Sequence, residues 1–412
     1  MKHSIVLLSF FSLIFISNKT LAQGETAVPF LSSPISPSTT GMGVTGASLP
    51  SDDPYGFLLN PAQLGNISQT TNFSFAFYPG SSELWGLEDY NINTLALNLG
   101  YNFEEKLNFP ISVGLGYARS NYSINEWGIK NDIYSTFSIG FGIDYGVQFN
   151  AGMSLKHIYS KLADRLNATE FSSAEATINA FDFGLLINVP ILKLIDKEMH
   201  FDLFENHPLS PFLNFSTGYS QLNNGDEIYY IEPSQADPLP RLAKLGYGLS
   251  MGFNLELEKQ TLKALGFDFT VDAEDLLLQY RIESDSLFPV MSRDGYQSFI
   301  GDINLGRNIF SVKGDDNVVS KVGFEIELFE IFSYRQGHLS GRGLNNVKTN
   351  GFEIKSDGIL KLISQPQEES AINYLSNHFA LRFSYSNYSL DENLDTDYYG
   401  LSLFVKDFNS LF

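Results

Sequence analysis

The stretch Leu242–Leu257, "LAKLGYGLSMGFNLEL", alternates large apolar side chains with small or polar ones along its length. A period of two is the period of a β-strand, whose successive side chains point to opposite faces. Strands of soluble proteins average about five or six residues, whereas a tilted strand needs about ten to cross a bilayer. This stretch therefore predicts a strand that crosses a membrane.

The same alternation recurs in "FPISVGLGYA" (Phe109–Ala118), in "TFSIGFGIDYGV" (Thr136–Val147) and along most of the chain. The predicted strands are residues 71–79, 91–103, 109–119, 133–146, 148–160, 176–190, 211–221, 242–256, 263–273, 296–310, 319–335, 350–362, 377–388 and 397–410. They predict an all-β fold, a transmembrane antiparallel up-and-down β-barrel of about 14 strands with an N-terminal plug segment. A soluble secreted sandwich or propeller is the alternative architecture.

The lengths of the predicted connections support the barrel. Polar connections such as "NNGDEIYYIEPSQADPLP" follow odd-numbered strands, and turns such as "EKQTL" follow most even-numbered ones. Bacterial barrels have this asymmetry, with short periplasmic turns and longer outer loops. Residues 191–208 and 363–376 depart from it, and we expect a short helix or cap at the periplasmic rim in the first of these.

The N-terminus indicates the compartment. Lys2 and His3 precede the apolar run Ile5–Ile16, and small residues suited to cleavage end at Ala22. Residues 1–22 are therefore predicted to be a signal peptide, 23–69 a plug or hatch segment and 70–412 a barrel integral to the bacterial outer membrane, with outer-membrane lipid as a partner.

Composition excludes several classes of protein. The 412 residues are 43% hydrophobic and 14% aromatic, which excludes a disordered chain. The formal charge of -21 argues against a nucleic-acid partner, because binding to phosphates needs a basic surface. The absence of cysteine excludes disulfides, thiolate nucleophiles and zinc-thiolate sites.

The segment Gly41–Gly65, "GMGVTGASLPSDDPYGFLLNPAQLG", begins with a G-x-G-x-x-G pattern. A dinucleotide-binding turn must follow a buried strand and open a helix. Upstream lies "PFLSSPISPSTT", which is too rich in Pro and Ser for a buried strand, and Pro50 interrupts any helix that follows. The glycines therefore do not indicate a nucleotide site, and no cofactor is expected.

Residue chemistry gives this segment another role. Asp53 before Pro54 is a good helix start, because the carboxylate caps free N–H groups and proline suits the first turn. A short helix would present Tyr55, Phe57, Leu58 and Leu59 before Pro61 ends it. Such an apolar element suits a plug inside the barrel mouth, and the alternative is a solvated periplasmic tail.

The spacing of this segment resembles the N-terminal signature of the PorV/PorQ family of FadL-like outer-membrane proteins. Gly41-Met42-Gly43 is followed by Asp52-Asp53 and then, after six residues, by Asn60-Pro61-Ala62. Similarity continues through Pro238–Phe253 and Lys321–Gly341, whereas Val44 and Gln63 stand where glycine is common in the family. The resemblance implies that the N-terminal segment folds into the lumen, with Gly41, Gly43, Asp52, Asp53, Asn60, Pro61 and Ala62 as the plug motif.

Three further features concern other parts of the chain. Glu325 and Glu327 alternate with apolar residues, so we expect them to face the lumen, where they either line a pathway or pair with inward Lys and Arg. The terminal aromatic Phe412 resembles the signal read by barrel assembly machinery. "GLSMG" (Gly248–Gly252) lies mid-strand and so is no nucleophile elbow, and the six His residues show no metal spacing. We expect neither an enzyme nor a metal site.

Two functions remain open. The family resemblance implies a docking or shuttle component that holds secreted cargo proteins at the outer membrane, as in type IX secretion, and the Asp-rich outer connections favour this reading. The alternative is a FadL-like channel for the uptake of hydrophobic small molecules, for which "LLLQY" (Leu276–Tyr280) would supply apolar entrance surface. Both functions use the same fold.

Overall fold

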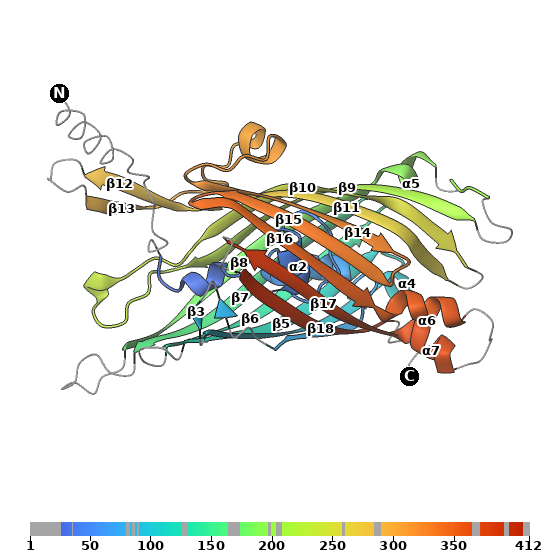
Figure 1. Ribbon diagram of the computed structural model, residues 1–412, viewed down its shortest axis with the longest axis horizontal. Helices are drawn as coiled ribbons and strands as arrows, with labels where there is room; N and C mark the ends of the chain where they lie inside the picture. Colours follow the sequence, from blue (N-terminus) through green and yellow to red (C-terminus); the bar gives the residue numbers. More distant parts are fainter. Residues whose placement is uncertain are drawn as a thin grey trace, which may run out of the picture.

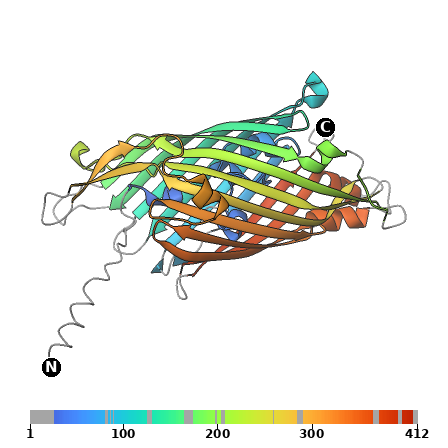
Figure 2. The ribbon, with the colours of Figure 1, turned by 90° about the horizontal axis from the view of Figure 1, so that it is seen from above.

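A closed antiparallel barrel of fourteen strands forms the body of the protein (Figures 1 and 2). The computed structural model describes residues 26–34, 36–79, 83–84, 87–88, 90–124, 130–163, 174–196, 199–202, 208–257, 260–283, 290–364, 371–390 and 395–406. Barrel strands that are neighbours along the chain pair with one another, and the first pairs with the last to close the wall. The predicted up-and-down barrel is therefore confirmed. The predicted signal peptide 1–22 and Phe412 lie outside the described residues.

The barrel strands are β1 (Phe73–Tyr78), β4 (Tyr90–Asn102), β5 (Ile111–Ile124), β6 (Lys130–Asp144), β7 (Gln148–Ala163), β8 (Ala174–Pro190), β9 (Leu209–Gly225), β10 (Leu242–Glu256), β11 (Thr261–Leu276), β14 (Val318–Leu328), β15 (Phe332–Gly341), β16 (Leu344–Lys355), β17 (Phe379–Ser389) and β18 (Asp395–Val405). Two small hairpins, β2 (Glu83–Leu84) with β3 (Leu87–Glu88) and β12 (Leu278–Glu283) with β13 (Val290–Tyr296), stand apart from the barrel sheet. The helical elements are η1 (Pro29–Ser32), α2 (Pro37–Gly41), η2 (Gly56–Leu58), α3 (Gln63–Ile67), α4 (Glu104–Leu107), α5 (Ile191–Ile195), η3 (Pro233–Gln235), η4 (Leu305–Phe310), α6 (Ser356–Ser364) and α7 (Ala371–His378).

The two ends of the barrel differ. Helices α4, α5, α6 and α7 lie at the right-hand end in Figure 1, in what we call the turn end. The hairpin β12–β13 extends from the opposite end, the loop end, which also carries the connection of residues 226–241. Helix α5 is the short helix expected in residues 191–208. No helix among the described residues is long and apolar enough to cross a membrane.

Two of the fourteen predicted strands are wrong, although the total is right. Residues 319–335 form two strands, β14 and β15, because Phe329 and Glu330 adopt positive φ angles of 53° and 52° and reverse the chain. No glycine, proline or asparagine marks this turn, so the apolar run "LFEIF" gave no sign of it. Residues 296–310 form no barrel strand and instead end in η4. The predicted strand 350–362 continues past Lys355 as α6.

An apolar belt surrounds the outside of the barrel. Tyr117, Phe137, Leu155 and Phe181 face one another across β5 to β8, and the row towards the turn end continues with apolar side chains. The next row towards the loop end is Arg119, Ser135, His157 and Asn179. This abrupt change from apolar to polar is the boundary expected where a membrane-spanning barrel leaves the hydrocarbon.

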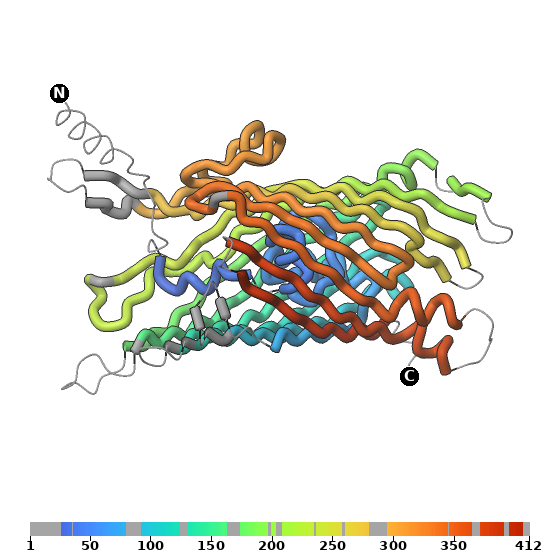
Figure 3. The backbone as a smooth tube through the Cα atoms, viewed as in Figure 1, coloured from blue at the N-terminus to red at the C-terminus, as the bar shows by residue number. Residues whose placement is uncertain are grey.

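The packed core lies inside the barrel, between its wall and the N-terminal segment, which is the blue tube within the barrel in Figure 3. The side chains of Phe30, Tyr55 and Phe57 are almost fully buried there. The Phe30 ring stacks on Tyr134 with ring centroids 5.9 Å apart, and it lies tilted against Tyr122 with centroids 5.1 Å apart. The inward strand faces therefore bury apolar surface against the plug rather than against one another.

The belt predicts how charge is tolerated along β7. Met153 lies in the belt opposite Ile139 and Phe183, whereas His157 lies just beyond its polar boundary. We expect Met153→Arg to lower the free energy of unfolding by about 2–4 kcal/mol and His157→Arg by at most about 1 kcal/mol. Urea unfolding in lipid vesicles measures both, and equal costs would contradict the belt.

Candidate functional site: the plugged lumen

The segment 26–72 runs through the lumen from the loop end to the turn end. At its start, the Ala27 N–H donates to the Pro238 carbonyl, 3.0 Å away, in the connection of the loop end. At its finish, the Asn72 N–H donates to the Val405 carbonyl at the last position of β18. This segment occupies the lumen along its length, and we call residues 26–72 the plug.

Glycines of the wall make room for the plug backbone. A Cβ atom at Gly337 would lie 2.0 Å from the Gly43 nitrogen, and one at Gly152 would lie 2.3 Å from the Pro61 carbonyl oxygen. Both distances are far below any real contact, so a side chain at these positions would displace the plug. Other wall glycines in the same situation are Gly114, Gly140, Gly184, Gly218 and Gly323. The small residues that alternate along the strands thus form the inner surface of the wall that contacts the plug.

The GMG turn is held at the β14–β16 wall. Gly43 has φ of +74°, which favours glycine, and its N–H donates to the Thr349 hydroxyl at 2.9 Å. The Gly41 carbonyl accepts a hydrogen bond from the same hydroxyl at 3.2 Å. Both predicted glycines therefore lie against β16, Gly41 at the end of α2 and Gly43 in the turn that follows it.

Asp272 of β11 anchors the next turn of the plug. One of its carboxylate oxygens accepts from the Gly46 and Ala47 N–H groups at 2.8 and 2.9 Å, and the other accepts from the Ser48 hydroxyl at 2.6 Å. Asp272 is buried. Hydrogen bonds from backbone N–H groups to a carboxylate are stronger than neutral ones, so this is a firm point of attachment.

The Asn60-Pro61-Ala62 motif ties two turns of the plug to β8. The Asn60 amide donates to the Ala47 carbonyl at 2.6 Å and to the Leu185 carbonyl at 3.1 Å, and its oxygen accepts from the Ala62 N–H at 3.0 Å. Gln63 closes the same loop, donating to the Leu49 carbonyl at 2.8 Å and accepting from the Ser51 N–H at 3.1 Å. Both side chains are buried.

The two residues of the acidic pair, Asp52 and Asp53, have different partners. Asp52 pairs with the Arg382 guanidinium of β17 at 2.5 Å, and Arg382 also binds Asp357 in the first turn of α6 at 3.1 Å. Lys406, just after β18, binds the same Asp357 at 3.0 Å. One buried cation therefore joins the plug to a helix at the turn end.

Asp53 caps the start of the element that follows. It accepts from the Tyr55 N–H at 3.0 Å and from the Ser36 hydroxyl. The expected short helix is only the single turn η2, but its side chains Tyr55, Phe57, Leu58 and Leu59 are all buried in the lumen. Burial, together with a smaller effect of the nearby Glu353, raises the pKa of Asp53 to about 6 despite these two hydrogen bonds.

Glu325 and Glu327 lie on the inward face of β14, within a network of opposite charges. Glu325 pairs with Arg335, which also binds Glu353 at 2.8 Å. Glu327 binds Lys355 at 2.6 Å and Lys263 at 2.8 Å. The two glutamates thus pair with inward cations of β11, β15 and β16 and also border a cavity.

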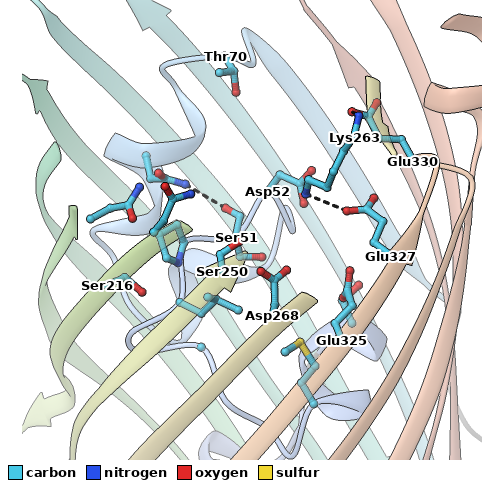
Figure 4. Close-up of a pocket in the computed structure, with 18 of the residues that line it drawn as sticks. Ser51, Asp52, Thr70, Ser216, Ser250, Lys263, Asp268, Glu325, Glu327 and Glu330 are labelled. Atoms are coloured by element: carbon cyan, nitrogen blue, oxygen red, sulfur yellow. Dashed lines mark hydrogen bonds and ion pairs between the residues drawn. The ribbon is translucent and has the colours of Figure 1, made fainter. Parts of the chain in front are cut away.

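Two cavities flank the plug. The turn-side cavity has a volume of about 590 Å³, and Figure 4 shows Asp52, Lys263, Asp268, Glu325 and Glu327 around it. The rest of its lining includes further charged side chains such as Arg335 and Lys355, hydroxyl and amide groups, and a few apolar residues of the plug. The loop-side cavity, of about 220 Å³, is lined by the apolar Phe30, Leu276, Val319, Leu339 and Tyr388 together with Glu274, Lys321 and Arg342. One side of the plug is therefore charged and the other amphiphilic.

Several plug anchors escaped the sequence analysis. Asp272, Arg382 and Thr349 lie on strands far along the chain, and nothing in the plug motif specifies them. The alternation of "KALGFDFTVDAEDL" (Lys263–Leu276) does place Asp272 on the inward face together with Asp268 and Glu274. The sequence signal that could have identified this anchor is an inward carboxylate, Asp272, in a chain that also has a glycine-rich plug segment.

Comparison with known proteins gives little beyond the barrel. No protein-family model matches the sequence, and no curated protein matches it significantly. Among solved structures, the chain is similar to the CymD monoaromatic hydrocarbon channel (TM-score 0.41, 11% identity, covering 91% of this chain and 97% of that one). It is also similar to the Ralstonia pickettii toluene transporter TbuX (0.38, 10%, 91% and 98%) and to a Pseudomonas aeruginosa FadL homologue (0.38, 8%, 91% and 99%). Likenesses this distant carry no conclusion about activity or about the PorV/PorQ resemblance.

The Asp272 anchor can be tested by removing its carboxylate. In Asp272→Ala the buried Gly46 and Ala47 N–H groups lose their acceptor, which costs about 1–3 kcal/mol for each unsatisfied group. We expect hydrogen exchange of these amides to quicken about tenfold or more, with the barrel strands unchanged. Asp268→Ala, on the same inward face, is the matched control. Unchanged exchange in Asp272→Ala would show that the plug does not depend on this anchor.

The raised pKa of Asp53 predicts a pH dependence. A carboxyl whose pKa is raised by folding favours the folded arrangement in its neutral form, and that contribution is lost as pH rises through about 6. After correction for intrinsic exchange rates, we expect the amides of residues 53–58 to be better protected at pH 5 than at pH 7.5. Asp53→Asn should abolish the difference, and a difference that survives in this variant would contradict the assignment.

Proposed function

We propose that this protein is a plugged outer-membrane channel that admits amphiphilic or hydrophobic small molecules from the loop end. The observation that carries the proposal is the pair of cavities on opposite sides of the plug. A barrel that served only as a rigid platform would need no chamber beneath its loops. The loop-side cavity offers apolar walls and a few charged groups, which is the usual make-up of a small-molecule site.

The route out of the loop-side cavity is lateral. A hydrophobic molecule would lose free energy by entering the charged turn-side cavity, because the polar groups there would have to give up partners. The wall offers another path: the pairing of β8 with β9 shifts register between Phe181 and Phe183, and a notch of about 570 Å³ lies on the outer face there. Pro240 lines the loop-side cavity, and the next residue, Arg241, lines the notch. The cavity and the notch are therefore both bordered by the segment that leads into β10.

Movement of the plug opens this route. Phe30, Pro29 and Val44 of the plug line the loop-side cavity, so a shift of α2 and the GMG turn changes its volume. The polar contacts between plug and wall are hydrogen bonds and ion pairs, which can break and form again with other partners. Asp52 and Arg382 are the charged contact that such a shift would break.

A disulfide across the plug tests the channel. The Ser38 and Ser384 hydroxyl oxygens lie 3.4 Å apart, one on α2 and one on β17, and the native chain has no cysteine. We expect the oxidised double variant Ser38→Cys/Ser384→Cys to take up a hydrophobic probe such as toluene into proteoliposomes at least tenfold more slowly than the reduced form. The single variants are the controls. Equal uptake in the oxidised and reduced forms would exclude a mobile plug.

Docking of secreted cargo proteins is the second candidate. Tyr229 and Ile231 are about half exposed in the otherwise polar connection of residues 226–241, which suits a protein-facing surface. Affinity purification from the native outer membrane would recover secreted proteins with a shared C-terminal domain if this reading holds. The oxidised double variant would retain that recovery, because a fixed plug leaves the outer connections unchanged.

A further inference from the structure

Residues 297–317 leave the loop end and fold back over the outside of the barrel wall. Ile303 and Ile309 are buried in a cluster with outward side chains of the wall. The wall residues in this cluster are Tyr219, Ala243, Ala273 and Val318, from β9, β10, β11 and β14. Figures 1 and 2 both show the short orange coil of η4 standing outside the wall, away from the β12–β13 hairpin. We call residues 297–317 the outer bracket.

Hydrogen bonds fix the outer bracket in place. The Tyr219 hydroxyl donates to the Phe299 carbonyl at 2.8 Å, and the Asp302 N–H donates to the Asp275 carboxylate at 2.7 Å. The Ser320 hydroxyl donates to the Asn308 carbonyl at 2.9 Å. Within η4, the Asn304 side chain accepts from the Arg307 N–H at 3.0 Å. The bracket is therefore a structured part of the wall.

The side of the bracket that points away from the barrel carries large exposed apolar side chains among polar ones. Phe299, Leu305 and Phe310 are 66%, 50% and 73% exposed. These three side chains are directed outwards even though Ile303 and Ile309, in the same segment, are buried. Asn304, Arg307 and Lys313 of the same segment are also exposed. Large apolar side chains next to charged ones suit an element at the boundary between hydrocarbon and water.

The exposed apolar side chains of the bracket continue the belt of the barrel. The Phe310 ring lies 6.4 Å from the ring of Tyr247, an outward residue of β10. The next outward residues of β10 towards the turn end are Leu249, Met251 and Phe253, which belong to the belt. Because the bracket is continuous with a surface that faces hydrocarbon, the same lipid covers both.

We propose that the outer bracket is a membrane anchor, with Phe299, Leu305 and Phe310 inserted among the acyl chains of the leaflet at the loop end. It covers the outward faces of β9, β10, β11 and β14, which would otherwise meet lipid directly. The bracket buries its isoleucines against protein and its phenylalanines in the bilayer, as an interfacial amphipathic element does. This role does not depend on what passes through the lumen.

Spin labelling tests the anchor, and the absence of native cysteines makes each label unique. Phe310→Cys and Leu305→Cys, each carrying a nitroxide in phosphatidylcholine vesicles, should be accessible to oxygen and shielded from nickel-EDDA. Met251→Cys in the belt sets the lipid reference and Tyr229→Cys in the loop-end connection sets the aqueous one. Heat-modifiable migration shows that each variant is folded.

We expect labels at 305 and 310 to give at least fivefold greater oxygen-to-nickel accessibility ratios than the label at 229, close to the ratio at 251. A ratio like that at 229 would place the bracket in water and overturn the proposal. Shielding from both reagents would show that protein covers the bracket, which would also overturn it.

Discussion

The plug backbone lies in direct contact with the inner wall of the barrel, and its closest approaches are at glycines, where the strands carry no side chain. A Cβ atom at Gly337 would lie 2.0 Å from a plug backbone atom, and one at Gly152 would lie 2.3 Å from another. Glycine in a strand normally weakens it by removing side-chain packing. Here the plug supplies that packing: Phe57 and Leu64 take the place of inward side chains, and barrel and plug complete each other's core.

Where plug and wall touch, contact this close leaves no room for water, so the polar backbone groups at these points must find partners in the protein. Asp272, Thr349 and Asn60 supply them at the three places where the chain turns. Asp272 and Thr349 are buried side chains of the wall, and the plug supplies their hydrogen-bond donors. The plug therefore has discrete arrangements rather than a continuous range, because any shift must exchange one complete set of hydrogen bonds for another.

Charge is distributed so that the plug is joined to the turn end of the barrel. Arg382 binds Asp52 of the plug and Asp357 of α6 through one guanidinium group. The neighbouring network of Glu325, Glu327, Arg335 and Lys355 balances opposite charges on adjacent strands, which keeps the inward face of β14–β16 polar without leaving an uncompensated charge. At the loop end the plug borders an amphiphilic cavity.

The sequence by itself determined the strand character of the chain and which residues of each strand face inwards, because the two faces of a strand meet different surroundings and a period of two records them. It also singled out Asp52, Asp53 and Asn60 as a structured motif. Only the tertiary structure decided what those residues bind. Asp272 lies 226 positions from Gly46, and the two meet because the stagger of all the strands around the closed barrel sets which inward residues face a given turn of the plug. The hairpin at Phe329 and the outer bracket were missed for a related reason: an apolar residue shows the same pattern whether it is covered by lipid, by the plug or by a loop folded over the outer wall.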